Sequence, residues 1–243
     1  MKPSGKRALV TGGSGGIGGA LCRRLAGQGH YVYVHAYRGA AVAHELVAQI
    51  VAAGGAASAL NFDITDTAAA RAALEAVLES GPIQILVNNA GVHDDAVLPG
   101  MQAQQWQRVI DVSVNGFFNA TQPLLLPMIR TRWGRIVNVS SIAALIGNKG
   151  QVNYAAAKGA LISATKALAL EVATRGITVN AVAPGIISTP MTSGLFDAEA
   201  IARLVPMNRA GLPEEVAAVV AFLASEEASY VTSQVIAVSG GMA

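Results

Sequence analysis

The chain has 243 residues, of which 52% are hydrophobic and 5% aromatic, and its 17 basic and 15 acidic side chains give a formal net charge of +2. This length suits one large core, and no change in composition marks a domain boundary. The small net charge excludes the basic stripe that nucleic-acid binding requires. No apolar run has the roughly 18 residues of a membrane span, and the start MKPSGKR lacks the apolar centre of a signal peptide. We therefore expect a cytoplasmic protein that binds neither membranes nor nucleic acid.

Short β-branched runs alternate with longer alanine-rich helical segments, which is typical of repeated βαβ units around a parallel sheet. We expect strands over 7–11, 31–35, 57–63, 83–87, 135–141, 178–184 and 234–240. We expect helices over 16–29, 40–55, 66–80, 103–129 and 153–175, and a last helix that begins at Pro213. The sequence thus predicts an α/β fold: one Rossmann-type, doubly wound parallel sheet of about seven strands with helices on both faces, in a single domain over 1–243.

Two smaller predictions come from composition. The single cysteine, Cys22, lies on the apolar side of a predicted helix, so we expect a buried, unreactive thiol. The four histidines lack ligand spacing, so we expect no metal site.

The irregular stretch 185–211 is rich in small residues and contains Pro190 and Pro206, and we expect it to form a substrate lid.

The stretch TGGSGGIG at 11–18 fits two motifs. Part of it matches G-x-S-x-G, in which Ser14 would be the nucleophile of a serine hydrolase. Such an enzyme needs an oxyanion loop upstream and a histidine downstream, but little chain precedes Ser14 and the last histidine is His93. The stretch also follows a predicted strand and begins a predicted helix, where free amide groups bind phosphate. We favour this phosphate cradle over the hydrolase.

The spacing T-G-x-x-x-G-x-G is followed by further motifs that occur in a fixed order. They are FD at 62–63, NNAG at 88–91, SS at 140–141, YAAAK at 154–158 and PGIIST at 184–189. With these motifs the chain resembles the short-chain dehydrogenase/reductase family over essentially its full length. The segments GNKGQVNYAAAKGAL, GITVNAVAPG and VTSQVIAVSGGM make it most similar to the 3-oxoacyl-(acyl-carrier-protein) reductases.

The side chains of these motifs suggest the chemistry. Tyr154 and Lys158 are four residues apart on a predicted helix, so they share one face. A phenol has a pKa of about 10, and we expect the ammonium of Lys158 to lower it, so that Tyr154 acts as general acid. The hydroxyl of Ser141, 13 residues before Tyr154, would polarise the substrate carbonyl while a nicotinamide delivers hydride.

The resemblance implies NADPH/NADP as the cofactor. The residues it assigns to cofactor binding are Gly12, Ser14, Gly16, Ile17, Gly18, Arg38, Asp63, Ile64, Asn89, Ala90, Gly91, Lys158, Ile187 and Thr189. The end of the second strand, VHAYRG, has no acid that would repel a 2′-phosphate, and Arg38 offers a forked contact to that group. Three simpler interpretations stay open: a solvated surface arginine at 38, a helix cap at Asp63, and a strand-ending turn in NNAG.

One position departs from the family pattern. Aligning WQRVIDVSVNGFF with the family segment places Ser113 where the family has an asparagine of the proton relay. That position acts partly through a backbone carbonyl, which serine retains, so we expect activity to survive. The departure also motivates a second hypothesis, in which the protein binds NADPH without turnover and serves as an assembly partner or sensor.

The resemblance also implies partners. Arg132 and Arg175 occupy the positions that engage the acidic acyl carrier protein, and opposite charge favours such docking. The expected substrate is thus a carrier-linked 3-oxoacyl thioester, and a coenzyme A thioester, a polyketide-type chain or another ketone or alcohol remain alternatives. A homotetramer is expected, with interfaces formed by the long helices 103–129 and 154–175 and the C-terminal strand.

Overall fold

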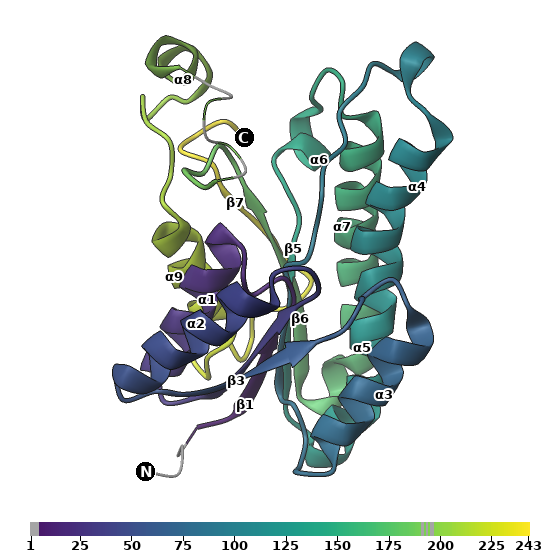
Figure 1. Cartoon of the computed structure of the whole chain (residues 1–243), viewed down its shortest axis with the longest axis vertical. Coiled ribbons are helices and arrows are strands. Elements are labelled where there is room, and N and C mark those ends of the chain that lie inside the picture. Colours follow the sequence, from purple (N-terminus) through teal and green to yellow (C-terminus); the bar gives the residue numbers. More distant parts are fainter. Residues whose placement is uncertain (1–4, 191, 193, 195–196) are drawn as a thin grey trace.

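The computed structural model describes residues 5–190, 192, 194 and 197–243. Its centre is a parallel sheet of seven strands in the order β3-β2-β1-β4-β5-β6-β7 (Figure 1). The strands are β1 (Arg7–Val10), β2 (Tyr31–Ala36), β3 (Ala56–Asn61), β4 (Ile85–Asn88), β5 (Gly134–Val139), β6 (Ile177–Pro184) and β7 (Val235–Val238). The predicted strand number and the doubly wound α/β fold are confirmed.

Helices cover both faces of the sheet. The α-helices are α1 (Gly16–Gly27), α2 (Ala40–Ala52), α3 (Thr67–Leu78), α4 (Ala103–Ile110), α5 (Gly116–Thr131), α6 (Ala143–Ile146), α7 (Val152–Val172), α8 (Ala198–Leu204) and α9 (Pro213–Leu223). In Figure 1, α1, α2 and α9 lie on one side of the strands and α3, α5 and α7 on the other. The two buried clusters have the same division, because each contains residues from one of these groups of helices.

The central strands explain why both faces are buried. Ala8 and Val10 of β1 belong to the cluster under α1, α2 and α9, whereas Leu9 between them belongs to the other cluster. All three are fully buried. Successive side chains of a strand point to opposite faces, so a continuous apolar strand needs a helical layer on each side.

The strand order reverses between β1 and β4, which are hydrogen-bonded neighbours with Leu9 opposite Leu86. In an open parallel sheet, this switch point opens a crevice at the carboxyl ends of the strands. The loops that follow β1 and β4 contain the predicted glycine turn and the NNAG motif. The fold therefore places both motifs beside one crevice.

The helix predicted over 103–129 is interrupted. Helix α4 ends at Ile110, residues Asp111–Asn115 form a π-helix, and α5 follows. The amide of Gly116 donates to the carbonyl of Asp111, five residues earlier, and the carboxylate of Asp111 accepts from the side-chain amide of Asn115 at 2.7 Å. Periodicity missed this insertion because one wide turn rotates the apolar stripe without ending it.

The segments after the strands contain short helices that the sequence analysis did not predict. A 3₁₀-helix spans Leu98–Gly100, α6 follows β5, and α8 lies inside the expected lid. Asp197 caps α8 by accepting the amide of Ala200 at 2.7 Å, so an acid at the start of an alanine-containing run was the available signal. Residues 191, 193 and 195–196 of the expected lid 185–211 lie outside the described residues.

Cys22 is fully buried in α1, and burial raises the pKa of its thiol to about 12. The thiol therefore stays protonated at neutral pH, which agrees with the prediction of an unreactive cysteine. No described helix is long and apolar enough to cross a membrane.

Candidate active site

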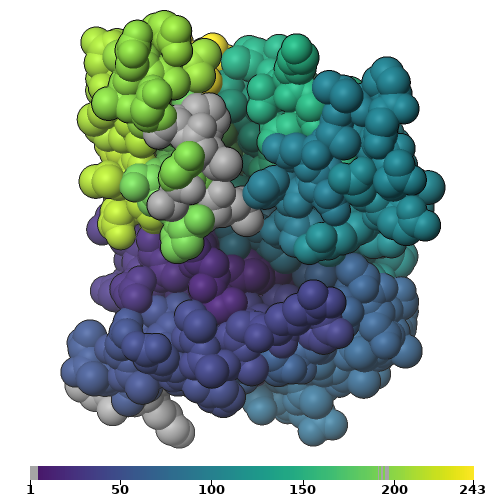
Figure 2. Space-filling model, turned by 45° about the horizontal axis from the view of Figure 1, so that its top comes forward, coloured from purple at the N-terminus to yellow at the C-terminus, as the bar shows by residue number. Residues whose placement is uncertain are grey.

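A cavity of about 330 Å³ opens at the carboxyl ends of the strands. Its lining comprises Gly12, Ser14, Gly15, Gly16, Ile17, Gly18, Asn89, Ala90, Gly91, Val139, Ser140, Ser141, Tyr154, Lys158, Pro184, Gly185, Ile187, Thr189 and Thr192. Figure 2 looks onto this end of the molecule, where the purple atoms of the N-terminal part lie recessed between the blue and teal segments and the green segment. All three predicted catalytic residues and most predicted cofactor residues therefore line one space.

The glycine turn between β1 and α1 forms one wall of this cavity. Gly12 has a φ of 63°, a conformation that glycine adopts without strain. A Cβ atom on Gly18 would collide with the carbonyl oxygen of Gly12, so α1 starts directly against the turn. No side chain caps α1 at Gly15, and within the described residues the first-turn amide of Ile17 has no backbone acceptor. This uncapped helix start fits the pyrophosphate of a dinucleotide.

The NNAG motif is tied to the glycine turn. The hydroxyl of Thr11 accepts the backbone N–H groups of Asn89 and Ala90, each at 3.0 Å. The side-chain amide of Asn89 donates to the carbonyl oxygens of Thr11 and Gly12 at 2.9 and 3.1 Å. These bonds span the switch point of the sheet and fix the two loops relative to each other, so NNAG is more than a strand-ending turn.

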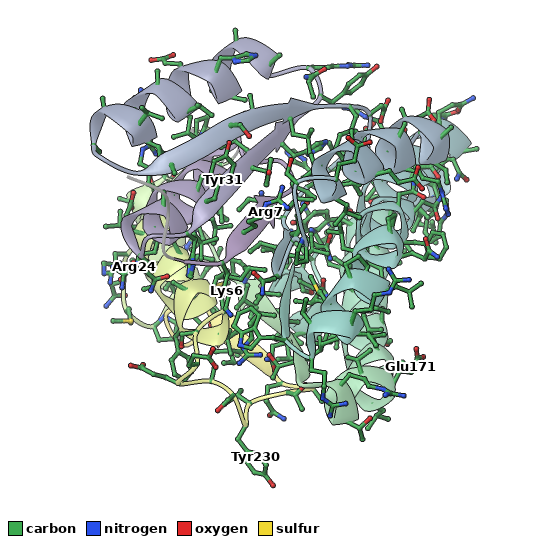
Figure 3. The ribbon with its side chains drawn as sticks, turned by 90° about the horizontal axis from the view of Figure 1, so that it is seen from below. Lys6, Arg7, Arg24, Tyr31, Glu171 and Tyr230 are labelled. Atoms are coloured by element: carbon green, nitrogen blue, oxygen red, sulfur yellow. The ribbon has the colours of Figure 1, made fainter. Side chains whose placement is uncertain are left out.

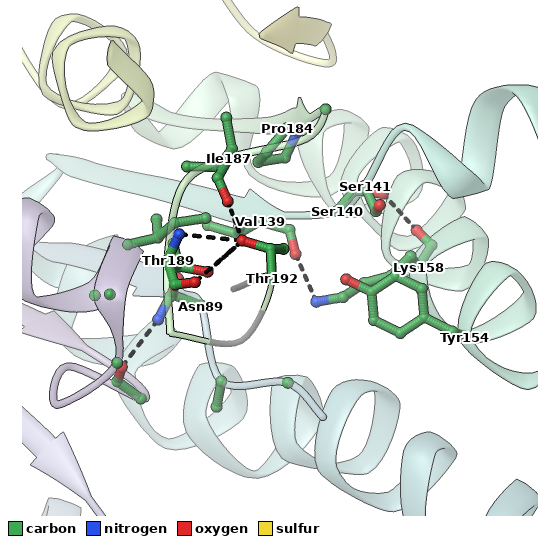
Figure 4. A pocket seen from close by; sticks show the side chains of 18 of the residues that line it. Asn89, Val139, Ser140, Ser141, Tyr154, Lys158, Pro184, Ile187, Thr189 and Thr192 are labelled. Carbon is green, nitrogen blue, oxygen red and sulfur yellow. Dashed lines mark hydrogen bonds between the residues drawn. The ribbon is translucent and has the colours of Figure 1, made fainter. Parts of the chain in front are cut away.

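Helix α7 brings Tyr154 and Lys158 to the opposite wall, as Figure 4 shows. The ammonium of Lys158 is buried, donates to the carbonyl oxygen of Val139 at 2.9 Å, and lies 5.7 Å from the centre of the Tyr154 ring. A Cβ atom on Gly91 would lie 2.9 Å from the Lys158 Nζ atom, so the last residue of NNAG leaves room for the lysine. The hydroxyl of Ser140 donates to the backbone carbonyl of Lys158 at 2.8 Å, which links the end of β5 to α7.

The structure corrects the expected pKa of Tyr154. Burial raises the pKa of this phenol above its usual value, the hydroxyl of Ser141 lowers it by a smaller amount, and the carboxylate of Asp95 adds a further increase. Lys158 does not act as the expected tuner here, because burial lowers its own pKa to about 8 and its hydrogen bond goes to Val139. In the protein alone, desolvation by burial is the largest effect on the pKa of the phenol. Tyr154 therefore keeps its proton through the neutral range.

The nicotinamide residues suggested by the resemblance, Ile187 and Thr189, line the same cavity beyond β6. Ile187 is buried, and the backbone of its neighbour Ser188 donates to Gly211 at 2.8 Å. The backbone N–H of Thr189 donates to the hydroxyl of Thr192 at 3.1 Å. These contacts give the start of the expected lid a defined path along the cavity.

Three predicted cofactor residues are absent from this lining. Arg38 is exposed in the loop after β2, with its guanidinium 5.7 Å from the centre of the Tyr37 ring. The carboxylate of Asp63 accepts the amide and hydroxyl of Thr65 at 2.9 and 2.8 Å, and the helix cap that the simpler interpretation expected at Asp63 is formed by Asp66 instead. Ile64 is buried and packs against Gly116. A Cβ atom on Gly39 would lie 2.7 Å from the Ser14 hydroxyl, so the loop of Arg38 is next to the glycine turn.

Ser113 lies in the π-helix and is 2% exposed, and its hydroxyl has no hydrogen-bond partner among the described residues. The π-helix packs against α7, which carries Tyr154 and Lys158. A π-helical turn is often found at functional sites. The position that departs from the family pattern is therefore buried against the helix of the predicted catalytic residues.

The hydrolase interpretation of Ser14 finds no support in its surroundings. His35 is the histidine nearest in the fold to the glycine turn, but its two ring nitrogens are hydrogen-bonded to the amide of Gly12 and the carbonyl of Phe62. Neither nitrogen is left to activate Ser14. The serine instead lines the cavity as part of the glycine turn.

Arg132 and Arg175 lie together, because the guanidinium of Arg132 donates to the carbonyl of Thr174 at 3.1 Å. They precede β5 and β6, so they are at the amino ends of these strands, whereas the cavity is at the carboxyl ends. A six-residue strand such as β5 spans about 20 Å. Figure 3 views the molecule from this amino-terminal side, with Arg7, Tyr31 and the end of α7 at Glu171 in view. Within one chain, the two arginines are thus remote from the mouth of the cavity.

Several residues at the site were missed by the sequence analysis. Gly15, Val139, Ser140, Pro184, Gly185 and Thr192 line the cavity. Four of them lie inside recognised motifs, Val139 directly precedes the SS motif, and Thr192 lies three residues after PGIIST. Asp95 was missed as well, although its carboxylate raises the pKa of Tyr154 and accepts a hydrogen bond from the side-chain amide of Gln151 at 2.8 Å. The acid pair at 94–95 after NNAG was the signal in the sequence. No sequence motif pointed to His35, because this residue at the end of β2 contacts Gly12 after β1 and Phe62 after β3, which are distant in the sequence.

Comparison with known proteins agrees with this geometry. A family model described as short chain dehydrogenase matches residues 6–200. A 3-oxoacyl-(acyl-carrier-protein) reductase of Synechocystis is 43% identical over 237 residues, which cover 97% of this chain and 96% of the relative. The enzyme FabG of the same description from Aggregatibacter actinomycetemcomitans is 45% identical over 96% of this chain and 98% of its own length.

A crystal structure of a candidate gluconate dehydrogenase from Agrobacterium tumefaciens superimposes with a TM-score of 0.95 at 32% identity, over 99% of this chain and 97% of that one. The fold is therefore shared with a protein whose name describes a different substrate from that of the 3-oxoacyl reductases. The chain belongs to the short-chain dehydrogenase family of oxidoreductases, which use a nicotinamide cofactor.

Proposed function

We propose that this enzyme reduces a carrier-linked 3-oxoacyl thioester to the 3-hydroxyacyl thioester, with NADPH as reductant, in fatty-acid or polyketide-type chain synthesis. The single observation that carries the proposal is the convergence of Ser141, Tyr154 and Lys158 on the cavity that the glycine turn also lines. The identity of 42–45% to proteins named 3-oxoacyl-(acyl-carrier-protein) reductase supports this substrate class.

The proposed roles follow from the protonation states. When bound, the reduced nicotinamide supplies hydride to the carbonyl carbon of the substrate. Tyr154 donates its proton to the carbonyl oxygen, because burial keeps the phenol protonated at neutral pH. Ser141 donates a hydrogen bond to the same oxygen and stabilises the charge that develops there. Lys158 has one acceptor, Val139, among the described residues, and its remaining N–H groups would hold the cofactor ribose.

The proposed cofactor site extends from the glycine turn to the loop after β2. The amides at the start of α1 bind the pyrophosphate, and Asn89, Ala90 and Gly91 border the cofactor on the side of β4. Arg38 binds the 2′-phosphate of NADPH, which the nearness of Gly39 to Ser14 supports. Asp63 and Ile64 border the adenine. The whole chain forms one cytoplasmic, dinucleotide-binding and catalytic domain, with 185–211 as the substrate lid.

Arg132 and Arg175 form the proposed docking site for the acidic carrier protein. Their neighbouring positions, established by the bond from Arg132 to Thr174, support one joint basic site. Since this site is at the amino-terminal edge of the sheet, a carrier bound there serves the cavity of another subunit in the proposed homotetramer. The exposed apolar side chains of Phe118 and Leu126 on α5 support an interface along this helix.

The direct test measures absorbance of the reduced nicotinamide with acetoacetyl thioesters of acyl carrier protein, coenzyme A and a short thiol. We expect NADPH oxidation with each and the highest kcat/KM with the carrier. Turnover of an unrelated ketone or of gluconate, without turnover of any 3-oxoacyl thioester, would replace the proposed substrate. Cofactor binding without turnover of any of them would favour the alternative of an NADPH-binding assembly protein or sensor, for which the substitution at Ser113 is the motivating observation.

A further inference from the structure

The imidazole of His35 joins the glycine turn to the next strand. His35 lies near the end of β2 and is 2% exposed. Its Nδ1 atom accepts the backbone N–H of Gly12 at 3.1 Å, and its Nε2 atom lies 3.1 Å from the carbonyl oxygen of Phe62, just after β3. The His35 and Phe62 rings are also in contact, with centroids 4.2 Å apart.

These two partners fix the tautomer of the ring. An amide N–H only donates, so the Nδ1 atom facing Gly12 must carry a lone pair, and a carbonyl only accepts, so the Nε2 atom must carry the hydrogen. An imidazolium would set a second N–H against that of Gly12 and would break the contact. Burial lowers the pKa of His35 to about 4, against smaller opposing effects of Phe62 and Asp63, so the neutral ring is maintained at physiological pH.

His35 also determines which amides of the glycine turn stay available. Its backbone carbonyl accepts the N–H of Gly13 at 2.7 Å, and its ring takes the N–H of Gly12. Within the described residues, the amides of Ile17 and Gly18 at the start of α1 have no backbone acceptor. The contacts of His35 therefore hold the first part of the turn, and the amides of the helix start remain for a ligand.

We propose that His35 is a positioning residue for the dinucleotide: its neutral ring holds the pyrophosphate-binding turn at a fixed distance from the end of β3. The segment after β3 carries Asp63 and Ile64, so the ring connects the two ends of the cradle, for pyrophosphate and for adenosine. The inference rests on the dinucleotide-binding part of the proposed function and is independent of the substrate. Since the pyrophosphate and adenine are common to NADH and NADPH, His35 affects both equally.

Matched variants of His35 separate the effect of its two side-chain hydrogen bonds from the effect of its packing. In His35→Phe the ring shape remains, but the amide of Gly12 and the carbonyl of Phe62 lose their partner. In His35→Asn the side-chain oxygen reaches the position of Nδ1 and still accepts from Gly12. The control is His30→Phe, because His30 directly precedes the other end of β2, away from the cavity, and accepts the amide of Lys6 at 3.1 Å.

Dissociation constants of NADPH and NADH are measured without substrate by titration calorimetry, and folding is checked by thermal unfolding. We expect His35→Phe to weaken both cofactors by about tenfold, since one lost bond at a buried amide has this effect. We expect His35→Asn to recover most of the affinity, His30→Phe to bind as the wild type does, and kcat at saturating cofactor to change less than affinity. Wild-type affinity in folded His35→Phe would overturn the proposal, as would a folded His35→Asn no better than His35→Phe.

Long-range ¹H–¹⁵N spectra of histidine-labelled wild-type protein provide a test that needs no variant. We expect the pattern of a neutral ring with hydrogen on Nε2 for His35. Hydrogen on Nδ1, or a charged ring at neutral pH, would overturn the proposal even if His35→Phe fails to fold. Apart from kcat, none of these measurements uses turnover, so the binding and NMR results stay valid if the 3-oxoacyl substrate is wrong.

Discussion

The ammonium of Lys158 lies 5.7 Å from the centre of the Tyr154 ring and donates its hydrogen bond to the carbonyl of Val139. The two side chains share one face of α7, but burial determines the protonation of each more strongly than their proximity. Burial raises the pKa of the phenol and lowers the pKa of the ammonium. Attraction between an ammonium and a phenolate would shift both pKa values the other way. This relationship leads to the first two predictions.

Replacing Tyr154 by phenylalanine removes the proton donor and keeps the ring in its partly buried position. We expect kcat for reduction of an acetoacetyl thioester to fall by about 10²- to 10⁴-fold, the usual contribution of a general acid. The assay follows oxidation of NADPH, and the dissociation constant of NADPH is the control, which we expect to stay within a few-fold of the wild type. Turnover that survives in Tyr154→Phe would remove Tyr154 from the proposed mechanism.

Lys158 has a folded-state pKa of about 8, below its ordinary value of 10.5. Between these values the unfolded chain binds more protons than the native protein, so this group makes the free energy of unfolding rise with pH through that window. Below about pH 8 the buried charge destabilises the native state, and Lys158→Met removes the charge. We expect the gain in free energy of unfolding from Lys158→Met to be about 2 kcal/mol larger at about pH 7.5 than at about pH 9.5.

Urea unfolding of both proteins at the two pH values measures this difference. Comparison with the variant cancels the titration of other groups, including Cys22, whose raised thiol pKa lowers stability at alkaline pH. A difference between wild type and Lys158→Met that is the same at both pH values would contradict the lowered pKa of the lysine.

Arg38 is expected to select the phosphorylated cofactor. Replacing it by aspartate removes a charge-assisted contact and adds repulsion, so we expect the dissociation constant of NADPH to rise by about 10- to 100-fold, with little change for NADH. Arg71→Asp is the control, because Arg71 is an exposed arginine on α3 with one weak ion pair to Glu75. An unchanged preference for NADPH would assign Arg38 to the solvated surface.

Arg132 and Arg175 are expected to act on the carrier and not on the acyl group. We expect Arg132→Glu and Arg175→Glu each to raise KM for acetoacetyl acyl carrier protein by about tenfold at low salt, and to leave KM for a short-thiol thioester unchanged. Arg130→Glu, on the last turn of α5, is the matched control for charge. An equal effect on both substrates would indicate a structural role for the two arginines.

The buried hydroxyl of Ser113 lacks a partner among the described residues, so removing it breaks no hydrogen bond to them. We expect Ser113→Ala to keep the free energy of unfolding within about 1 kcal/mol of the wild type or to raise it. We expect activity to survive in Ser113→Ala, because the backbone carbonyl of this position is kept. A large loss of kcat with unchanged stability would show that the hydroxyl itself takes part in catalysis.

The sequence predicted the fold because each of its signals is local. Apolar strands such as 7–10 and 85–88 need a helical layer on both faces, and the helical segments between them supply it. Most cavity-lining residues could be predicted for a related reason. Parallel strands end at one edge, so the motifs that directly follow β1, β4, β5 and β6 must meet there.

Other features depend on contacts between distant segments. The π-helix at 111–115 keeps the apolar pattern of a continuous helix, and the protonation of Tyr154 and Lys158 depends on their burial in the folded protein. His35 joins Gly12 to Phe62 across three strand ends. The sequence by itself determined which strands, turns and reactive side chains this protein has. Only the tertiary structure decided their charge states, the partners of their buried polar groups and the separation of Arg132 and Arg175 from the cavity, because desolvation and distance arise from packing and not from sequence order.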